Sequence, residues 1–241
     1  DTPAEYITVG DIFETWRTSA GDIGNNAAAT FSTTELMGDV VDADNVLRMY
    51  VNGTPVHSYA DYQIHNNDRI VLVYGSSDIV ALESNSGTLL FEMLSEAAPN
   101  TVENFLNYVS DGDYQGSIIH RSVPGFVIQG GGFITDSPTL TSTSQLSSVP
   151  TDSPVINEFA VSNTRGTVAM AKLGGDPNSA TSQWFVNLAD NSANLDNQNG
   201  GFTVFAKILD MAAADSIAAL GRQNLGGAFT DLPVALGDQL V

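Results

Sequence analysis

The spacing of hydrophobic residues predicts two helices after residue 98. After Pro99, which occupies a favoured first helical position, the apolar residues lie three or four apart, as on one face of a helix: Val102, Phe105, Leu106 and Val109. Gly112 is a typical residue to end that helix. A second helix is predicted over residues 211–220, ended by Gly221.

Short apolar segments around these helices predict strands. Residues 78–84 and 87–94 form a predicted hairpin around Asn85-Ser86-Gly87. From residue 118 onward, further segments alternate with clusters of Gly, Pro, Asn and Ser: 126–129, 166–171, 183–188 and 204–208. This rhythm is typical of an antiparallel barrel or sandwich, so the pattern predicts a barrel capped by two helices.

The first 76 residues have a different pattern, with a short helix over residues 6–16 and then a hairpin. In that hairpin, residues 46–51 are the first strand, and Asn52-Gly53 supplies the two turn positions that favour positive φ. Pro55 confines the returning strand to a sheet edge. Residues 70–75 are short and apolar enough to predict a buried strand.

Ser76-Ser77 is the predicted boundary between a small α+β domain, residues 1–76, and a larger domain, residues 77–241. The front domain resembles the β-grasp fold of ubiquitin-like sulfur carriers. Those carriers act through a free C-terminal Gly-Gly, whereas Gly75 continues into Ser76, so a carrier function is excluded. A docking or spacing module is expected instead.

Charge and composition narrow the function classes. The chain has 28 acidic and 8 basic residues, a net charge of −20, so it would repel nucleic acid and anionic membranes. We find no apolar run long enough to cross a membrane. Because the acids are spread along both halves, a highly solvated surface is the simplest interpretation. The opening Asp1-Thr2-Pro3 favours an exported protein over a cytoplasmic one.

Several catalytic chemistries are excluded by the residue types present. There is no cysteine, so disulfides, thiol catalysis and thiolate-bound metals are ruled out. His57, His65 and His120 lie far apart in the sequence, and no metal site is expected. Neither a nucleophile elbow nor a phosphate-binding loop is present, so we expect no cofactor and no covalent intermediate.

Five sequence blocks carry the candidate chemistry. The longest, residues 114–131, reads YQGSIIHRSVPGFVIQGG. It is preceded by APNTVENFLNYV and followed by NEFAVSNTRGTVAMAK, SQWFVNLADN and NLDNQNGGFTVFAKI. In order and spacing, these blocks across residues 79–236 resemble the cyclophilin family. The resemblance implies a peptidyl-prolyl cis/trans isomerase whose domain is an eight-stranded antiparallel β-barrel capped by two α-helices.

The resemblance also implies roles for individual residues. Arg121 would be the catalytic arginine, and Gln129 and Gln183 would hold the substrate backbone and position that arginine. Ala171-Lys172 would contact the residue before proline through its main chain, with the Lys172 side chain in water. The proline pocket would be lined by Phe126, Val127, Phe185, Leu195 and Phe202.

Arg121 by itself would be interpreted as a surface ion-pair partner. Its position among Phe, Val and Pro favours a function, since an unpaired charge is costly in apolar surroundings. The competing hypothesis is a non-catalytic module that binds proline peptides, but such modules usually lack the arginine or the pocket aromatics. His120 is expected to be a structural, hydrogen-bonded histidine, because the reaction transfers no proton.

Three residues depart from the commonest family pattern. Val127 replaces a frequent Met, Phe202 replaces a frequent His or Tyr, and Asn194 stands where an aromatic residue often contacts cyclosporin. We therefore expect cyclosporin-type ligands to bind with weakened affinity. The expected partners are proline-containing peptides and unfolded protein clients.

Overall fold

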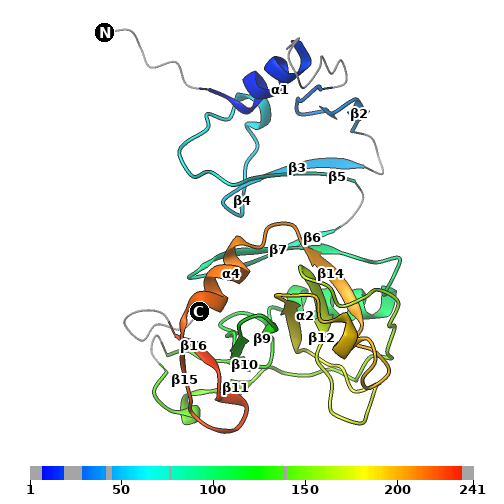
Figure 1. The fold of residues 1–241 in the computed structure, drawn as a ribbon, viewed down its shortest axis with the longest axis vertical. Coiled ribbons are helices and arrows are strands. Elements are labelled where there is room, and N and C mark those ends of the chain that lie inside the picture. The colour runs from blue at the N-terminus through cyan, green and yellow to red at the C-terminus, as the bar shows by residue number, and fades with distance from the viewer. Residues whose placement is uncertain (1–6, 19–28, 42–44, 76–77, 138–139, 235–241) are drawn as a thin grey trace. The chain divides into compact units, whose positions relative to one another are not determined.

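The computed structural model describes residues 7–18, 29–41, 45–75, 78–137 and 140–234 (Figure 1). The chain divides into two compact units, Asp1–Ser76 and Ser77–Val241. Each unit has hydrophobic clusters of its own among the described residues. The units are therefore described separately.

The front unit contains one helix and a three-stranded antiparallel sheet in the order β4-β3-β5. Its elements are α1 (Val9–Thr18), β1 (Glu35–Leu36), β2 (Asp39–Val40), β3 (Val46–Val51), β4 (Thr54–Pro55), the 3-10 turn η1 (Tyr59–Asp61) and β5 (Ile70–Gly75). Asn52 and Gly53 have φ values of 53° and 82°, which confirms the predicted turn. Pro55 lies on an edge strand, as its missing N–H requires.

Two predictions for the front unit need correction. The helix begins at Val9 and not at residue 6, which lies outside the described residues; the Thr8 hydroxyl accepts a bond from Asp11 N at 3.1 Å just before the first turn. Strand β5 is mostly half-buried, with Val73 its one buried residue. It is the other edge of a small sheet, so less of its surface is covered. The β-grasp type stays a prediction.

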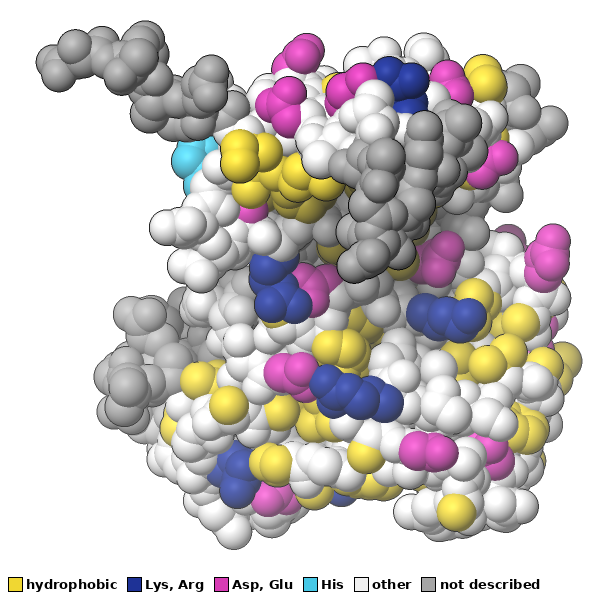
Figure 2. All heavy atoms as spheres, turned by 45° about the horizontal axis from the view of Figure 1, so that its top comes forward, with side chains coloured by type: hydrophobic (Ala, Val, Ile, Leu, Met, Phe, Trp, Pro, Cys, Tyr) yellow, Lys and Arg dark blue, Asp and Glu magenta, His cyan; other side chains and the backbone are white. Residues whose placement is uncertain are grey.

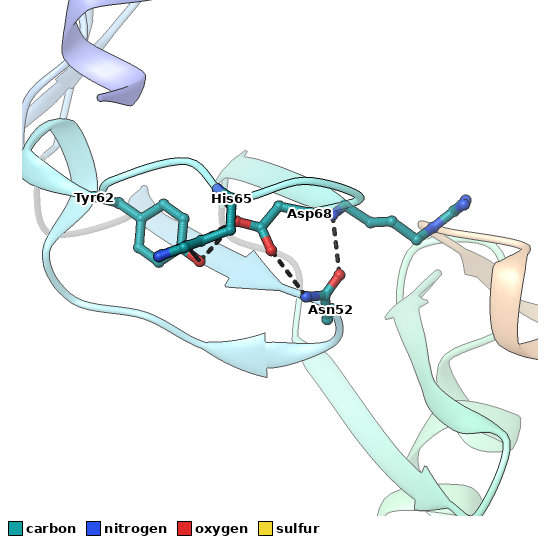
Figure 3. Close-up of polar contacts among 5 residues, drawn as sticks. Asn52, Tyr62, His65 and Asp68 are labelled. Atoms are coloured by element: carbon teal, nitrogen blue, oxygen red, sulfur yellow. Dashed lines mark hydrogen bonds and ion pairs between the residues drawn. The ribbon is translucent and has the colours of Figure 1, made fainter. Parts of the chain in front are cut away.

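Asp68 holds the two turns of the front sheet together (Figure 3). Its carboxylate accepts bonds from Tyr62 OH at 2.9 Å, His65 N at 2.7 Å and Asn52 Nδ2 at 3.2 Å. Asn52 in turn accepts from Arg69 N at 3.0 Å. These bonds fix the Asn52-Gly53 turn against the segment that leads into β5, and the backbone bond from His65 is the main cause of a lowered Asp68 pKa.

A seven-stranded antiparallel sheet forms most of the second unit, in the order β6-β7-β14-β12-β13-β9-β8. Its strands are β6 (Ile79–Ser84), β7 (Gly87–Met93), β8 (Arg121–Val123), β9 (Val127–Gly130), β12 (Thr167–Met170), β13 (Trp184–Asn187) and β14 (Val204–Ile208). Smaller pairs are β10 (Phe133–Ile134) with β11 (Ser147–Ser148), and β15 (Gly221–Gln223) with β16 (Leu232–Val234).

The strand count differs from the predicted eight. Strand β16 comes beside β8, but one backbone bond, from Ser122 N to Asp231 O at 2.7 Å, joins the two segments. Strand β16 pairs instead with β15, and this separate hairpin takes the place of an eighth strand in the main sheet.

Both predicted helices are present: α2 (Pro99–Asp111) and α4 (Ala212–Ala219), with a further short helix, α3 (Ser192–Leu195). Gly112 ends α2 with φ 78°, as predicted. The helices share one core with the sheet. It is formed around four side chains that are each 0% exposed: Phe91, Phe105, Phe205 and Ile217. That core keeps the strands in fixed positions, and with them the side chains on the opposite face of the sheet.

The central strands bury both of their faces. Along β13, Trp184 and Val186 point into the main core, whereas Phe185 belongs to a second cluster with Val127 and Leu195. The period of two along a strand separates the clusters. The residues predicted to form the proline pocket all lie on the face of this second cluster.

Acidic side chains are dispersed over the one face of the molecule that Figure 2 shows. On the face turned to the viewer, Figure 2 shows Asp and Glu side chains scattered singly and in small groups. This distribution fits the solvated surface inferred from the sequence. Across the described ranges, every helix is too short or too polar to cross a membrane.

Candidate active site

A row of cross-strand neighbours forms the base of the site. Arg121 on β8 pairs with Gln129 on β9, Gln129 pairs with Phe185 on β13, and Phe185 pairs with Ala169 on β12. Directly paired residues point to the same side of a sheet. The strand register therefore brings a cation, an amide and an aromatic ring together from segments that are distant in the sequence.

A cavity of about 230 Å³ lies over this row. Its lining combines polar and apolar side chains from both ends of the row: Arg121, Phe126, Val127, Gln129, Ala171, Lys172, Phe185, Leu195 and Phe202. Among the residues predicted for catalysis and binding, Gln183 is the one outside this lining. It lies directly behind the lining, bonded to Gln129.

The Arg121 guanidinium stands beside an aromatic wall. Its Cζ is 5.8 Å from the centroid of the Phe126 ring, within the range of a cation–π contact. The residue is half-buried, and throughout the described part of the chain its guanidinium has no hydrogen bond or ion pair. Its donors are thus free to meet a ligand.

The two glutamines bond each other and not Arg121. Gln129 Nε2 donates to Gln183 Oε1 at 2.9 Å. A Cβ at Gly132 would lie 2.7 Å from Gln183 Cδ, and one at Gly131 would lie 2.5 Å from the Ser182 carbonyl oxygen. The glycine run therefore allows a close backbone approach that keeps the Gln183 side chain in place.

Aromatic rings form the apolar side of the cavity. The rings of Phe185 and Phe202 meet edge to face at 5.7 Å and 73°. Leu195, on α3, is 6% exposed and completes this side with Val127. The space between them has apolar walls with a cation at one end.

The Lys172 side chain does not extend into water, so that prediction is wrong. Its Nζ donates to Asn157 Oδ1 at 3.0 Å, Asn199 O at 2.9 Å and Gly201 O at 2.7 Å. It also lies 4.9 Å from the Phe202 ring centroid. Burial lowers the pKa of Lys172. The oxygens of a neighbouring turn replace the water that the ammonium would otherwise bind.

Sequence reasoning missed a buried amide network that fixes two walls of the cavity. Asn191 Nδ2 donates to Phe126 O at 2.9 Å and to Asn187 Oδ1 at 2.7 Å, and Asn187 Nδ2 donates to Asn163 Oδ1 at 3.2 Å. Asn163 Nδ2 then reaches Phe202 O at 3.0 Å. The sequence signal that could have revealed the network is an Asn at the end of the apolar run WFVN, and the structure shows that this Asn187 is fully buried.

His120 lies next to Arg121 in the chain but belongs to another environment. Its ring contacts Phe133 at 5.0 Å, centroid to centroid, and it is 2% exposed. Burial lowers its pKa from 6.5 to about 4, with a further contribution from Arg121. Among the described residues Nδ1 has no hydrogen-bond partner, so the prediction of a hydrogen-bonded histidine fails at this atom.

A larger cavity of about 640 Å³ lies elsewhere in the second unit. Residues from the β6–β7 hairpin and from the segment after α2 line it, including Leu82, Tyr114 and Ile119. None of the predicted site residues is in its lining. The chemistry-bearing groups therefore gather in the smaller cavity.

Comparison with known proteins identifies the same part of the chain. The family model described as "Cyclophilin type peptidyl-prolyl cis-trans isomerase/CLD" matches residues 79–231. The peptidyl-prolyl cis-trans isomerase of Acinetobacter baylyi is 37% identical over 155 residues, which cover 63% of this chain and 77% of that protein. Peptidyl-prolyl cis-trans isomerase B of Escherichia coli is 37% identical over 156 residues, covering 61% and 89%.

A solved structure has the same fold. The crystal structure of a cyclophilin type peptidyl-prolyl cis-trans isomerase of Cryptosporidium parvum, in the presence of the dipeptide Ala-Pro, matches with a TM-score of 0.51 and 22% identity. The match covers 68% of this chain and 94% of that one. It confirms the predicted fold class, a mainly β domain with few helices.

The sheet register, the cavity and these matches together define a class of isomerase. The chain belongs to the family of cyclophilin-type peptidyl-prolyl cis-trans isomerases.

Proposed function

We propose that this isomerase acts on X-Pro bonds in extended peptides and unfolded protein chains, with Arg121 as the catalytic group. The observation that supports this most directly is the Arg121 guanidinium, which has no hydrogen bond or ion pair among the described residues and lines a cavity with aromatic walls, 5.8 Å from the Phe126 ring centroid. The apolar walls suit a proline ring. Nothing in this arrangement requires a cofactor.

The chemistry needs one well-placed cation. Rotation about the X-Pro amide meets a barrier of roughly 18–20 kcal/mol, because resonance shares the nitrogen lone pair with the carbonyl. Twisting the bond returns the lone pair to nitrogen. A hydrogen bond from Arg121 to that nitrogen stabilises the twisted state more than the planar one, which is what accelerates a reaction.

The energy required is within reach of one arginine together with a water-excluding apolar pocket. A turnover of about 10³ per second corresponds to a barrier of about 13 kcal/mol, a reduction of roughly 5–7 kcal/mol. A hydrogen bond to a charged group contributes about 1.5–3 kcal/mol, and exclusion of water strengthens it. The cavity walls at Phe126, Phe185 and Leu195 would exclude water once a proline ring fills the space.

The glutamines and the segment at Ala171 would hold the substrate backbone. In the Gln129–Gln183 pair, one amide group donates to the other, which leaves Gln129 Oε1 and Gln183 Nε2 without a bond among the described residues. These atoms offer one acceptor and one donor to a peptide. Ala171 N already donates to Gln183 O at 2.9 Å, which ties the segment at Ala171 to the backbone of Gln183.

The alternative is a module that binds proline peptides without turning them over. Exchange spectroscopy on a short Ala-Xaa-Pro-Phe peptide separates the two functions. An isomerase increases the rate at which cis and trans signals interconvert, whereas a binding module shifts the signals and leaves that rate as it is in buffer. We expect the faster exchange, and a rate equal to that in buffer would overturn the proposal.

We also propose that cyclosporin binds weakly. Asn194 is exposed on α3 and offers a polar amide where an aromatic ring would give more contact area. Cyclosporin added to the exchange assay should inhibit only at concentrations well above nanomolar, and an Asn194→Trp variant should be inhibited more readily. Nanomolar inhibition of the unaltered protein would contradict this.

A further inference from the structure

The turn before Phe202 has an uncommon backbone. Asn199, Gly200 and Gly201 are three successive residues in the left-handed region, with φ values of 51°, 76° and 75°. A side chain at Gly201 would also collide with the Phe159 ring. Glycine and Asn adopt these φ values with little strain, but a glycine pair is also free to take other conformations, so contacts from outside the turn are needed to select this one.

Two side chains hold that turn by its carbonyl groups. Lys172 Nζ donates to the carbonyls of Asn199 at 2.9 Å and Gly201 at 2.7 Å, and Asn157 Nδ2 donates to the carbonyl of Gly200 at 2.8 Å. Lys172 Nζ also donates to Asn157 Oδ1 at 3.0 Å. Every carbonyl of the turn is therefore bound. We call these two side chains and the turn the Lys172 clamp.

The clamp controls one wall of the proline pocket. Phe202 follows the turn directly, and its ring contacts both the Lys172 ammonium, 4.9 Å from the ring centroid, and the Phe185 ring, 5.7 Å away. The three acceptors and the ring that surround the ammonium are all uncharged, so none of these contacts neutralises its charge. The cation can thus orient both the carbonyls and the Phe202 face.

We propose that the Lys172 ammonium is a positioning group that sets the place of the Phe202 ring and thereby the affinity of the pocket for proline. This inference rests on the proposed function, since it concerns the same pocket. Phe202 would contact the proline ring in the planar and the twisted states alike. Loss of its position therefore weakens binding of both states and raises KM more than it lowers kcat.

Steady-state exchange kinetics on the full chain test this with three variants. Lys172→Met removes the charge but keeps the length, and we expect KM to rise about tenfold with kcat changed less than about threefold. Lys172→Arg retains a cation and hydrogen-bond donors and should recover most of the affinity. Lys207→Met removes the same charge from an exposed position on β14 and should leave KM as in the unaltered protein.

The proposal is overturned if Lys172→Met raises KM no more than Lys207→Met, or if kcat alone falls. NMR signals of the Phe202 ring give a readout that does not need turnover. They should shift or broaden in Lys172→Met and stay unchanged in Lys207→Met; unchanged signals in both variants would also overturn the clamp. An unaltered protein without isomerase activity, but with the expected Phe202 response, would refute the proposed function and leave the clamp standing.

Discussion

Arg121, the first residue of β8, and its two neighbours in the chain point to opposite sides. Arg121 faces the cavity, whereas His120 and Ser122 are buried on the other side. The sequence could indicate Arg121, because few basic residues occur and this one lies among apolar neighbours. It could not indicate that His120 Nδ1 lacks a partner in the described part of the chain, since that depends on Phe133 and Phe229 packing around the ring.

His120 should make stability depend on pH. Its pKa falls from 6.5 to about 4 on folding, so the unfolded chain binds the proton first as pH decreases. The folded state is then destabilised progressively between pH 6.5 and about 4, by up to about 3 kcal/mol, and not further below. Above pH 6.5 the residue contributes no pH dependence.

Urea unfolding at several pH values measures this effect. A His120→Phe variant should lose that part of the pH dependence, while His65→Gln, at an exposed histidine of the front unit, should retain it. Parallel curves for His120→Phe and the unaltered protein would contradict the assignment.

At the scale of elements, helix α2 depends both on local residues at its ends and on a contact from a distant part of the chain. Pro99 and Gly112 mark the ends of α2, and both were predicted from the sequence. The N-cap position before α2, however, is occupied by Ala98, whose side chain cannot accept a hydrogen bond. Glu158, 58 residues from Asn100, supplies the missing acceptor to Asn100 N at 3.2 Å and to Thr101 N at 2.8 Å.

Removal of this distant cap should destabilise the second unit. Burial raises the Glu158 pKa, but bonds from Thr101 and Asn100 outweigh it and the net pKa is lowered, so the stabilisation is present near neutral pH and is lost as pH falls. Glu158→Ala should lower the free energy of unfolding by about 1–2 kcal/mol at pH 7.

Glu96→Ala is the matched control, because Glu96 is exposed and lies just before the same helix. Chemical denaturation of both variants provides the comparison. Equal unfolding free energies for the two would show that Glu158 is not the cap.

Turns and strand pairing limit prediction in the same way. The Asn52-Gly53 turn follows from its two residues, whereas the left-handed turn at 199–201 depends on Lys172 and Asn157, far away in the chain. The predicted number of strands differs from the structure because β16 pairs with β15, and no local sequence pattern indicates this pairing. The amide network from Phe126 to Phe202 likewise joins strands that only the fold brings together.

At the scale of the whole molecule, a strongly acidic chain keeps a cationic site. The chain has eight basic and 28 acidic residues. Two of the eight basic residues, Arg121 and Lys172, line one cavity of about 230 Å³. The predicted lining came from the family resemblance, and the register of four strands explains why those distant residues meet. The front unit has its own hydrophobic cluster, and its docking role stays a prediction.

The central claim is that Arg121 stabilises the twisted X-Pro bond. The most direct measurement is the cis/trans exchange rate of an Ala-Xaa-Pro-Phe peptide with Arg121→Ala, Arg121→Lys and the exposed control Arg222→Ala. The account predicts a loss of about a hundredfold in kcat/KM for Arg121→Ala, a smaller loss for Arg121→Lys and none for Arg222→Ala. Arg121→Ala that exchanges the peptide as fast as the unaltered protein would contradict it.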